Sequence, residues 1–452
     1  ETPRPVEELI AERSQVFSLK EALKLAYSGN PRILAARAEL FGTHEALPQA
    51  MAGWKPLINT QGDVTAVARN SDPGNEQDTV EKAVSLTLTQ PLYSGGSTFA
   101  ATDSAKERIK AQRAVLSAIE QDVLLDAVTA YMDVVRDESL LLLVQNNRDL
   151  IAQQLEATRA RFEVGELTRT DVSQAEARLA EAESRIISVK ADLRSSAAFY
   201  EQVIGVVPRD VKAPNVDMDL PESLQRAQAL TEEQNPEIIA AEYIYEAAVD
   251  NVDTIFGELL PQIGLQAGWS RTDDPRPGTL DRSSTGTIGL VATIPLYEAG
   301  ATRSRIREAK YAAMENRYNI REQKRRAREN VIRAWENLAA ARAEIESRKA
   351  QVRAAEIARE GVQEETQVGA RTVLDALDAD QELLDARTAL VIARADEVVS
   401  AHALARAIGI LIPRNVGIDA GHQDYDAHLN RAKSKIFDVD VEEPVGQLDG
   451  EL

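Results

Sequence analysis

The sequence predicts an α+β membrane protein that consists mostly of long antiparallel coiled-coil helices, with four β-strands per chain. Three observations support this prediction. The chain repeats itself once, each copy contains a pair of strand-like segments, and each pair is followed by a very long helical stretch. The repeat is clearest at residues 18–31, SLKEALKLAYSGNP, which return about 205 positions later as SLQRAQALTEEQNP at residues 223–236. So long a period indicates a duplicated half-structure, because a solenoid repeat spans only about 20 to 50 residues.

The same register continues through both copies. Short motifs recur about 204 positions apart: Pro91, Leu92, Tyr93 and Gly96 with Pro295, Leu296, Tyr297 and Gly300, Val164 and Gly165 with Val368 and Gly369, and Ile204 and Gly205 with Ile408 and Gly409. The chain is therefore divided into a first repeat (1–205), a proline-containing linker (206–222), a second repeat (223–413) and an acidic tail (414–452). From its composition, we expect the tail to be mostly disordered or draped on the outside of the molecule.

Each repeat begins with a helical segment and continues with two predicted strands. The helical segments cover residues 18–52 and 223–259, and prolines end both. The strands are expected at 57–69, 80–93, 262–271 and 284–297, with turn-rich connections at 70–75 and 272–278. In the second strand, Val84, Leu86 and Leu88 alternate with polar residues. A strand of about 10 residues with one apolar face suits a tilted membrane strand.

A very long helix follows each strand pair. Residues 97–164 contain no proline or glycine, and residues 301–368 contain only Gly361. At about 1.5 Å per residue, such a helix would be about 100 Å long. A heptad pattern predicts a coiled-coil seam: Val331, Leu338, Ile345 and Val352, with Ala327, Ala334, Ala341 and Ala355 beside them. The valine–glycine pairs should reverse the chain into second helices at 170–203 and 372–408.

The composition excludes several classes of function. The formal net charge of −21 opposes nucleic-acid binding, although an acidic lining for cations remains possible. There is no cysteine, none of the four histidines forms an HExxH pair, and no glycine-rich phosphate loop occurs. We therefore expect no enzyme activity, no cofactor and no metal site.

Four membrane strands cannot close a barrel around a lumen. Three chains would supply about 12 strands and leave no edge exposed to lipid. A homotrimer is the simplest closed solution, with a 12-stranded barrel in the lipid and the long helices continuing as an α-helical tunnel into the periplasm.

The order of these motifs, together with the run VGARTVLDALDA at residues 368–379, resembles the TolC family of outer-membrane efflux and type I secretion channel-tunnel proteins. The resemblance covers about residues 15–413. It implies a homotrimeric exit duct in the outer membrane of a Gram-negative bacterium, with a gated periplasmic entrance. Its implied partners are a periplasmic adaptor (a membrane fusion protein) and an inner-membrane pump of the RND or ABC type, and its cargo is drugs, toxic compounds or polypeptides.

The resemblance also implies roles for individual residues. Asp375 and Asp378 would form two acidic, cation-binding rings at the pore constriction, although charge statistics alone favour a solvated helix face. Arg371 would contact Asp171 or Thr170 as a gate latch, whereas an exposed ion pair is worth only about 0 to 1 kcal/mol. The family has a tyrosine where this chain has Thr366, so part of its closing network is missing or replaced.

Two further sets of residues are candidates for contacts outside the pore. The helical tips would dock the adaptor: Val164, Gly165, Glu166, Leu167, Val368 and Gly369. Tyr93, Trp269 and Tyr297 would lie at the membrane interface, or simply pack against neighbours. The alternative function is a soluble periplasmic coiled-coil scaffold or adaptor with no pore.

Overall fold

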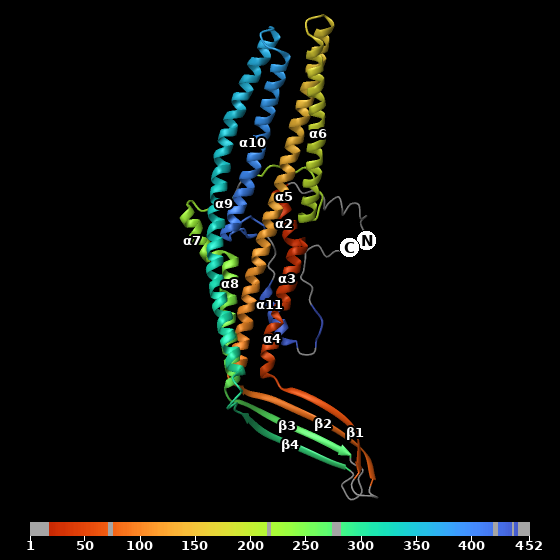
Figure 1. Cartoon of the computed structure of the whole chain (residues 1–452), viewed down its shortest axis with the longest axis vertical. Helices are drawn as coiled ribbons and strands as arrows, with labels where there is room; N and C mark the ends of the chain where they lie inside the picture. The colour runs from red at the N-terminus through yellow and green to blue at the C-terminus, as the bar shows by residue number, and fades with distance from the viewer. Residues whose placement is uncertain are drawn as a thin grey trace, which may run out of the picture.

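The computed structural model describes residues 18–70, 76–214, 218–273, 282–418, 424–435 and 438–441. The molecule is elongated, with the helices stacked along the long axis and the sheet at one end (Figure 1). Most of the two predicted strand connections, at 70–75 and 272–278, lies outside the described residues.

The elements follow the same order in both halves. The first half contains α2 (Leu19–Gly29), α3 (Pro31–His44), α4 (Ala46–Met51), η1 (Ala52–Trp54), β1 (Leu57–Asn70), β2 (Glu76–Ser94), α5 (Ser97–Glu163) and α6 (Arg169–Ile204). The second contains α7 (Leu224–Gln234), α8 (Pro236–Phe256), η2 (Gly257–Leu259), β3 (Gln262–Asp273), β4 (Arg282–Thr293), α9 (Ala301–Gln367) and α10 (Val373–Ile408). A last helix, α11 (Tyr425–Ser434), follows. The predicted repeat is therefore present in the fold.

The four strands form one antiparallel sheet in the order β1-β2-β3-β4. Its register separates two faces, because residues directly opposite each other share a face. One face carries the apolar rows Ile58, Leu88, Ala267 and Ile288, and Thr60, Leu86, Trp269 and Gly286. The other carries the polar rows Asn59, Thr87, Gly268 and Thr287, and Gln61, Ser85, Ser270 and Thr285. The predicted alternation is confirmed.

Two proline residues explain why β2 and β4 end differently, although both strands were predicted to reach the equivalent tyrosine. β4 ends at Thr293, so the prediction of a strand that continues to Tyr297 is wrong. Pro295 has no backbone N–H with which to extend the ladder. The equivalent Pro91 lies inside β2, where the register shifts between Pro91 and Tyr93. This bulge lets β2 continue to Ser94.

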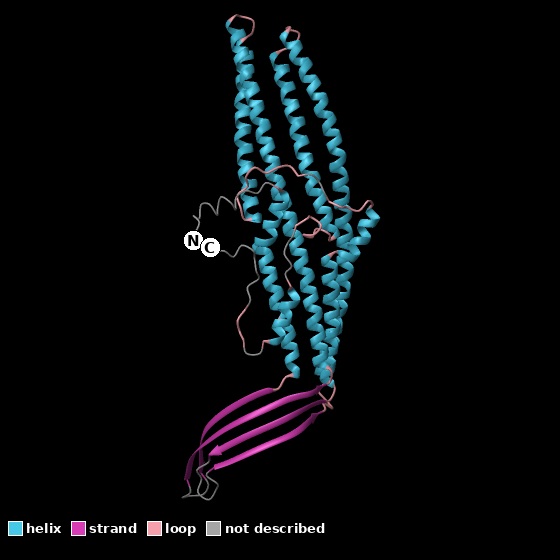
Figure 2. Ribbon diagram, turned by 180° about the vertical axis from the view of Figure 1, so that it is seen from behind, coloured by secondary structure: helices cyan, strands magenta, loops and turns pink. Residues whose placement is uncertain are grey.

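The long helices match the predicted ranges within one or two residues. α5 and α9 each contain 67 residues. Both begin after a glycine with positive φ, 83° at Gly96 and 84° at Gly300, a conformation that other residues rarely adopt. Val331, Leu338 and Ile345 are buried on the predicted seam of α9. Figure 2 shows the two antiparallel hairpins, α5–α6 and α9–α10, running side by side away from the sheet.

The largest hydrophobic core lies at the level where α2 crosses the long helices. It combines Leu23 of α2 with Tyr131 of α5, Tyr200 of α6 and Ala405 of α10. Since both halves contribute side chains, the two repeats pack as one unit rather than as independent domains.

The tail contains a helix that its composition did not suggest. Tyr425–Ser434 folds as α11 and packs against α3 and α4. The ring of His428 stacks on Phe41 with 3.9 Å between centroids, and Leu429 joins a cluster with Leu47. For this segment the structure favours the draped alternative over disorder, because one face of α11 buries apolar and aromatic surface.

Candidate functional site

The two hairpins end in turns of the same design. In the first turn, the Gly165 N–H donates to Phe162 O and the Glu166 N–H to Arg161 O, both at 2.9 Å. In the second turn, Gly369 and Ala370 donate to Thr366 O and Glu365 O. This Schellman arrangement needs a left-handed residue, and φ is 80° at Gly165 and 78° at Gly369.

The turns present apolar side chains to solvent. Val164 is 72% exposed and Val368 is 81% exposed, and the backbone of both lies at the outermost bend. Glu166 is also exposed, and Leu167 is half-buried. The structure thus places the predicted docking residues together at the tips, while their role stays a prediction.

Each hairpin continues from its turn into a capped second helix, α6 or α10. The Asp171 carboxylate accepts from the N–H and hydroxyl of Thr168 at 2.8 and 2.7 Å. The Asp375 carboxylate does the same with Thr372, at 2.9 and 2.7 Å. In return, the N–H groups of Asp171 and Asp375 donate to the hydroxyl oxygens of Thr168 and Thr372, which completes a capping box in both halves.

These caps keep both carboxylates ionised. The hydroxyl of Thr372, then its backbone N–H, hold the pKa of Asp375 below its usual range, and the charge of Arg371 adds to this. The backbone N–H of Thr168, then its hydroxyl, lower the pKa of Asp171. Both aspartates therefore carry a negative charge at physiological pH.

Asp378 lies one turn further along α10 and has a different partner. Its Oδ1 is 2.6 Å from Nη2 of Arg178 on α6. Seven residues later, Asp385 Oδ1 is 3.3 Å from Arg185 Nη2. Near the tip, Asp378 is exposed and Asp375 is half-buried, and an arginine already faces Asp378.

The predicted latch does not form within one chain. Nε of Arg371 lies 2.9 Å from Oε2 of Glu365, across its own turn. Asp171 is engaged by Thr168, and Thr170 is exposed at the start of α6. Thr366, at the position of the family's tyrosine, is buried and donates to Val362 O at 2.7 Å.

The three aromatic candidates lie at different heights on the sheet. Tyr93 is the penultimate residue of β2, near the helices. Trp269 lies inside β3 rather than at its end, opposite Leu86 and Gly286. Tyr297 follows the end of β4 and is almost fully exposed. Trp269 therefore lies within its strand, whereas Tyr93 lies at the end of a strand and Tyr297 beyond one.

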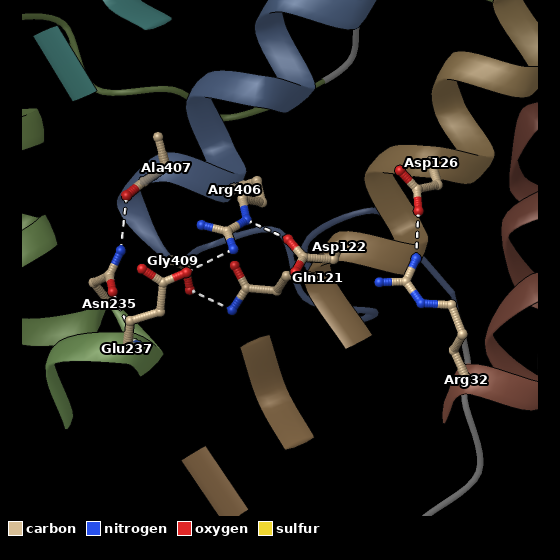
Figure 3. A network of polar contacts seen from close by, with 9 residues as sticks. All are labelled: Arg32, Gln121, Asp122, Asp126, Asn235, Glu237, Arg406, Ala407 and Gly409. Carbon is tan, nitrogen blue, oxygen red and sulfur yellow. Dashed lines mark hydrogen bonds and ion pairs between the residues drawn. The ribbon is translucent and has the colours of Figure 1, made fainter. Parts of the chain in front are cut away.

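Figure 3 shows polar contacts that were not predicted from the sequence, some within one half and some between the halves. Arg406 of α10 bridges Asp122 of α5 at 2.6 Å and Glu237 of α8 at 2.8 Å. Asn235 donates to Ala407 O at 3.0 Å. The repeated Asn-Pro motif was the available signal, because Asn30 donates to Val203 O in the same way at 2.8 Å.

Neither a membrane helix nor a metal site is found in the described part of the chain. No helix there has both the length and the apolar character needed to cross a lipid bilayer. Histidine and carboxylate side chains within the same ranges do not gather in groups of three or more that could hold a metal ion.

Comparison with known proteins gives consistent matches over most of the chain. The model of the family described as outer membrane efflux protein matches residues 22–206 and 228–410. The outer membrane efflux protein BepC of Brucella suis is 33% identical, over 93% of this chain and 91% of its own. The outer membrane protein TolC of Vibrio cholerae is 26% identical, over 92% and 94%.

Two further matches extend the comparison. The alkaline protease secretion protein AprF of Pseudomonas aeruginosa is 23% identical, over 86% of this chain and 83% of its own. The crystal structure of the outer membrane protein VceC of Vibrio cholerae superposes with a TM-score of 0.74 and 20% identity, over 86% of this chain and 96% of VceC. The structural match shows that the two chains share a fold.

Proposed function

This chain belongs to the outer membrane efflux protein family, and from that premise we propose that three copies close around one channel through the outer membrane. The protein is an outer-membrane exit duct, a transport protein and not an enzyme. Relatives are named both for efflux and for protease secretion, so the family's cargo includes small compounds and polypeptides.

One observation carries the proposal: a two-faced sheet with two unpaired outer edges is joined directly to 67-residue helices. The apolar face exposes large side chains such as Ile58, Leu86 and Ile288. In water such a surface is unfavourable, whereas in lipid it is the expected outer face of a membrane sheet. The polar face of serine, threonine, asparagine and glutamine then lines the lumen.

The edges of the sheet explain why more than one copy is needed. Among the described strands, β1 pairs only with β2, and β4 pairs only with β3. Unpaired N–H and C=O groups are very unfavourable in a lipid environment. Pairing β1 of one copy with β4 of the next satisfies both edges, and three copies give about 12 strands.

The end of the apolar face that lies farthest from the helices supports an interfacial role for Trp269. Arg271 follows it on the same face, and the next row contains Lys82, Asp273 and Arg282. Trp269 therefore lies where apolar residues give way to charges, which is the usual place of a membrane-interface tryptophan. Tyr93 and Tyr297 lie at the opposite end of the sheet, near the helices, and are proposed for the periplasmic interface.

The entrance is assigned to the tips of the hairpins. Asp375 and Asp378 of three copies form the acidic rings, which attract cations to the constriction. Arg371 is proposed to reach Asp171 or Thr170 of a neighbouring copy, in exchange for its contact with Glu365. The exposed tips around Val164 and Val368 dock a periplasmic adaptor, which connects the duct to an inner-membrane pump.

Single-channel recording in planar bilayers tests the function. We expect small, cation-selective currents that multivalent cations block from one side only. Asp375→Ala combined with Asp378→Ala should reduce both the cation selectivity and the block. The control is Glu163→Ala with Glu364→Ala, which removes two exposed negative charges from the same end of the molecule but not from α10.

Two results would contradict the proposal. Unchanged selectivity in the aspartate variant would remove these residues from the constriction. Failure of folded, helical protein to produce any current would favour the alternative, a soluble scaffold or adaptor without a pore.

A further inference from the structure

The pore entrance contains positive charges that face its acidic residues. Arg178 of α6 contacts Asp378 of α10 at 2.6 Å and Glu181 of its own helix at 3.0 Å. One heptad further from the tip, Arg185 repeats the contact with Asp385 at 3.3 Å. The two arginines therefore connect α6 of the first hairpin with α10 of the second.

Packing beneath these ion pairs fixes their geometry. Ala175 and Ala182 of α6 are buried with Val373 and Leu377 of α10 in one cluster. Ile186 and Leu384 join a second cluster. Because small and apolar side chains hold the two helices close, Arg178 lies within reach of Asp378 rather than extended into solvent.

The two acidic positions differ in the charge that surrounds them. Asp375 is held by the uncharged Thr372, with Arg371 exerting only a secondary influence. Asp378 forms a direct ion pair. In the conformation seen here, Asp375 is bound by an uncharged partner, whereas Asp378 shares the positive charge of Arg178 with Glu181.

We propose that Arg178, which is shared between Asp378 and Glu181, sets the charge of the pore entrance by offsetting part of the negative charge of Asp378 while α6 and α10 are in contact. Separation of the two helices breaks the pair, so the entrance becomes more acidic as it widens. Arg178 is a residue that determines ion selectivity, and Asp385 and Arg185 extend the same contact along the helices. This inference rests on the proposed function, since it requires Asp378 to face the channel.

The experiment compares reversal potentials and multivalent-cation block of the full-length protein in planar bilayers. Arg178→Gln should increase cation selectivity and lower the blocking concentration by about three- to tenfold, because three charges are removed within a screened distance of the rings. Arg178→Lys keeps the charge and should behave like the wild type. Arg169→Gln removes an exposed charge nearer the tip and serves as the matched control.

A double-mutant comparison separates this inference from the proposed function. Asp378→Asn should reduce the selectivity more strongly in the Arg178→Gln background than in the wild type. If Arg178→Gln and Arg169→Gln show the same selectivity and block, or if Asp378→Asn has the same effect in both backgrounds, the proposed role of Arg178 is wrong. The proposed duct is not contradicted by that result. If neither Asp375→Asn nor Asp378→Asn alters selectivity in any background, both are wrong.

Discussion

The tips of the first and second hairpins have the same backbone design but differ in their charged residues. Both reverse the chain through a glycine, and both cap the following helix, α6 or α10, with a Thr-x-x-Asp box. Three residues after the capping aspartate, the first half has Gln174 and the second has Asp378. The shared residues are those needed to turn the chain, whereas Asp378 has no equivalent in the first half.

The ion pair across each turn likewise combines a shared feature with a difference between the halves. Arg161 contacts Glu166 in the first turn at 3.1 Å, and Glu365 contacts Arg371 in the second at 2.9 Å. The contact is kept while the order of the charges is reversed. Duplication thus provides an internal control: a feature present in both copies serves the fold, and a feature present in one is a candidate for function.

Substitutions at the ends of α6 and α10 should give the largest difference in stability between the halves. Gly205 and Gly409 both have positive φ, 89° and 100°. A Cβ on Gly205 would meet nothing within 4 Å, whereas one on Gly409 would lie 2.5 Å from Gln234 O. Gly205→Ala should cost about 1 kcal/mol from backbone strain, and Gly409→Ala about 3 kcal/mol or more from strain and overlap.

Thermal unfolding of the two variants, followed by far-UV circular dichroism at one protein concentration, measures this difference. A much lower melting temperature for Gly409→Ala is expected. Equal decreases in melting temperature for the two variants would mean that the contact between α10 and the α7–α8 junction is not rigid.

A smaller difference should follow from α11, which packs on α3 and α4 of the first half. His44 is fully buried, and its Nδ1 lies 3.0 Å from Nδ1 of His428. Burial, then the charges of His428 and Arg113, lower the pKa of His44 to about 4, although Asp426 opposes them. Lys433 also lowers it. The folded pKa is depressed, so docking is fully stable above the ordinary pKa of 6.5 and weakens as the pH falls towards 4.

Hydrogen exchange of α11 between pH 7 and pH 4.5 tests this expectation, after correction for the intrinsic pH dependence of exchange. Protection should fall by at most about 1.4 kcal/mol per pH unit in that window. His44→Phe should abolish the dependence at this site. A pH dependence that persists in His44→Phe would assign the effect to another group.

The ends of the long helices were predictable because local chemistry determines them. Gly96, Gly165 and Pro236 each fix the backbone where an element begins or ends, and the duplication doubled the signal. The helix α11 could also have been predicted, since Tyr425, His428, Leu429 and Ala432 follow a helical spacing of apolar residues. The acidic residues around it obscured that pattern.

The side-chain partners at the entrance could not be predicted from the sequence. Arg178 and Asp378 are 200 residues apart, and only the packing of α6 on α10 brings them together. Arg371 was predicted to contact Asp171 or Thr170, and within the chain the structure places it on Glu365 instead. Such choices depend on tertiary geometry and on differences of about 1 kcal/mol or less.

The most direct test of the account is disulfide cross-linking between the outer strands of neighbouring copies. The sequence contains no cysteine, so Thr60→Cys in β1 can be combined in turn with Ser284→Cys, Gly286→Cys, Ile288→Cys or Leu290→Cys in β4 without background. Within one chain β2 and β3 separate these strands by about 14 Å, too far for a disulfide. We predict covalent dimers and trimers in the outer membrane, with the ladder ending at the trimer. No cross-link at any position, or a ladder that continues beyond three copies, would contradict the closed trimeric duct.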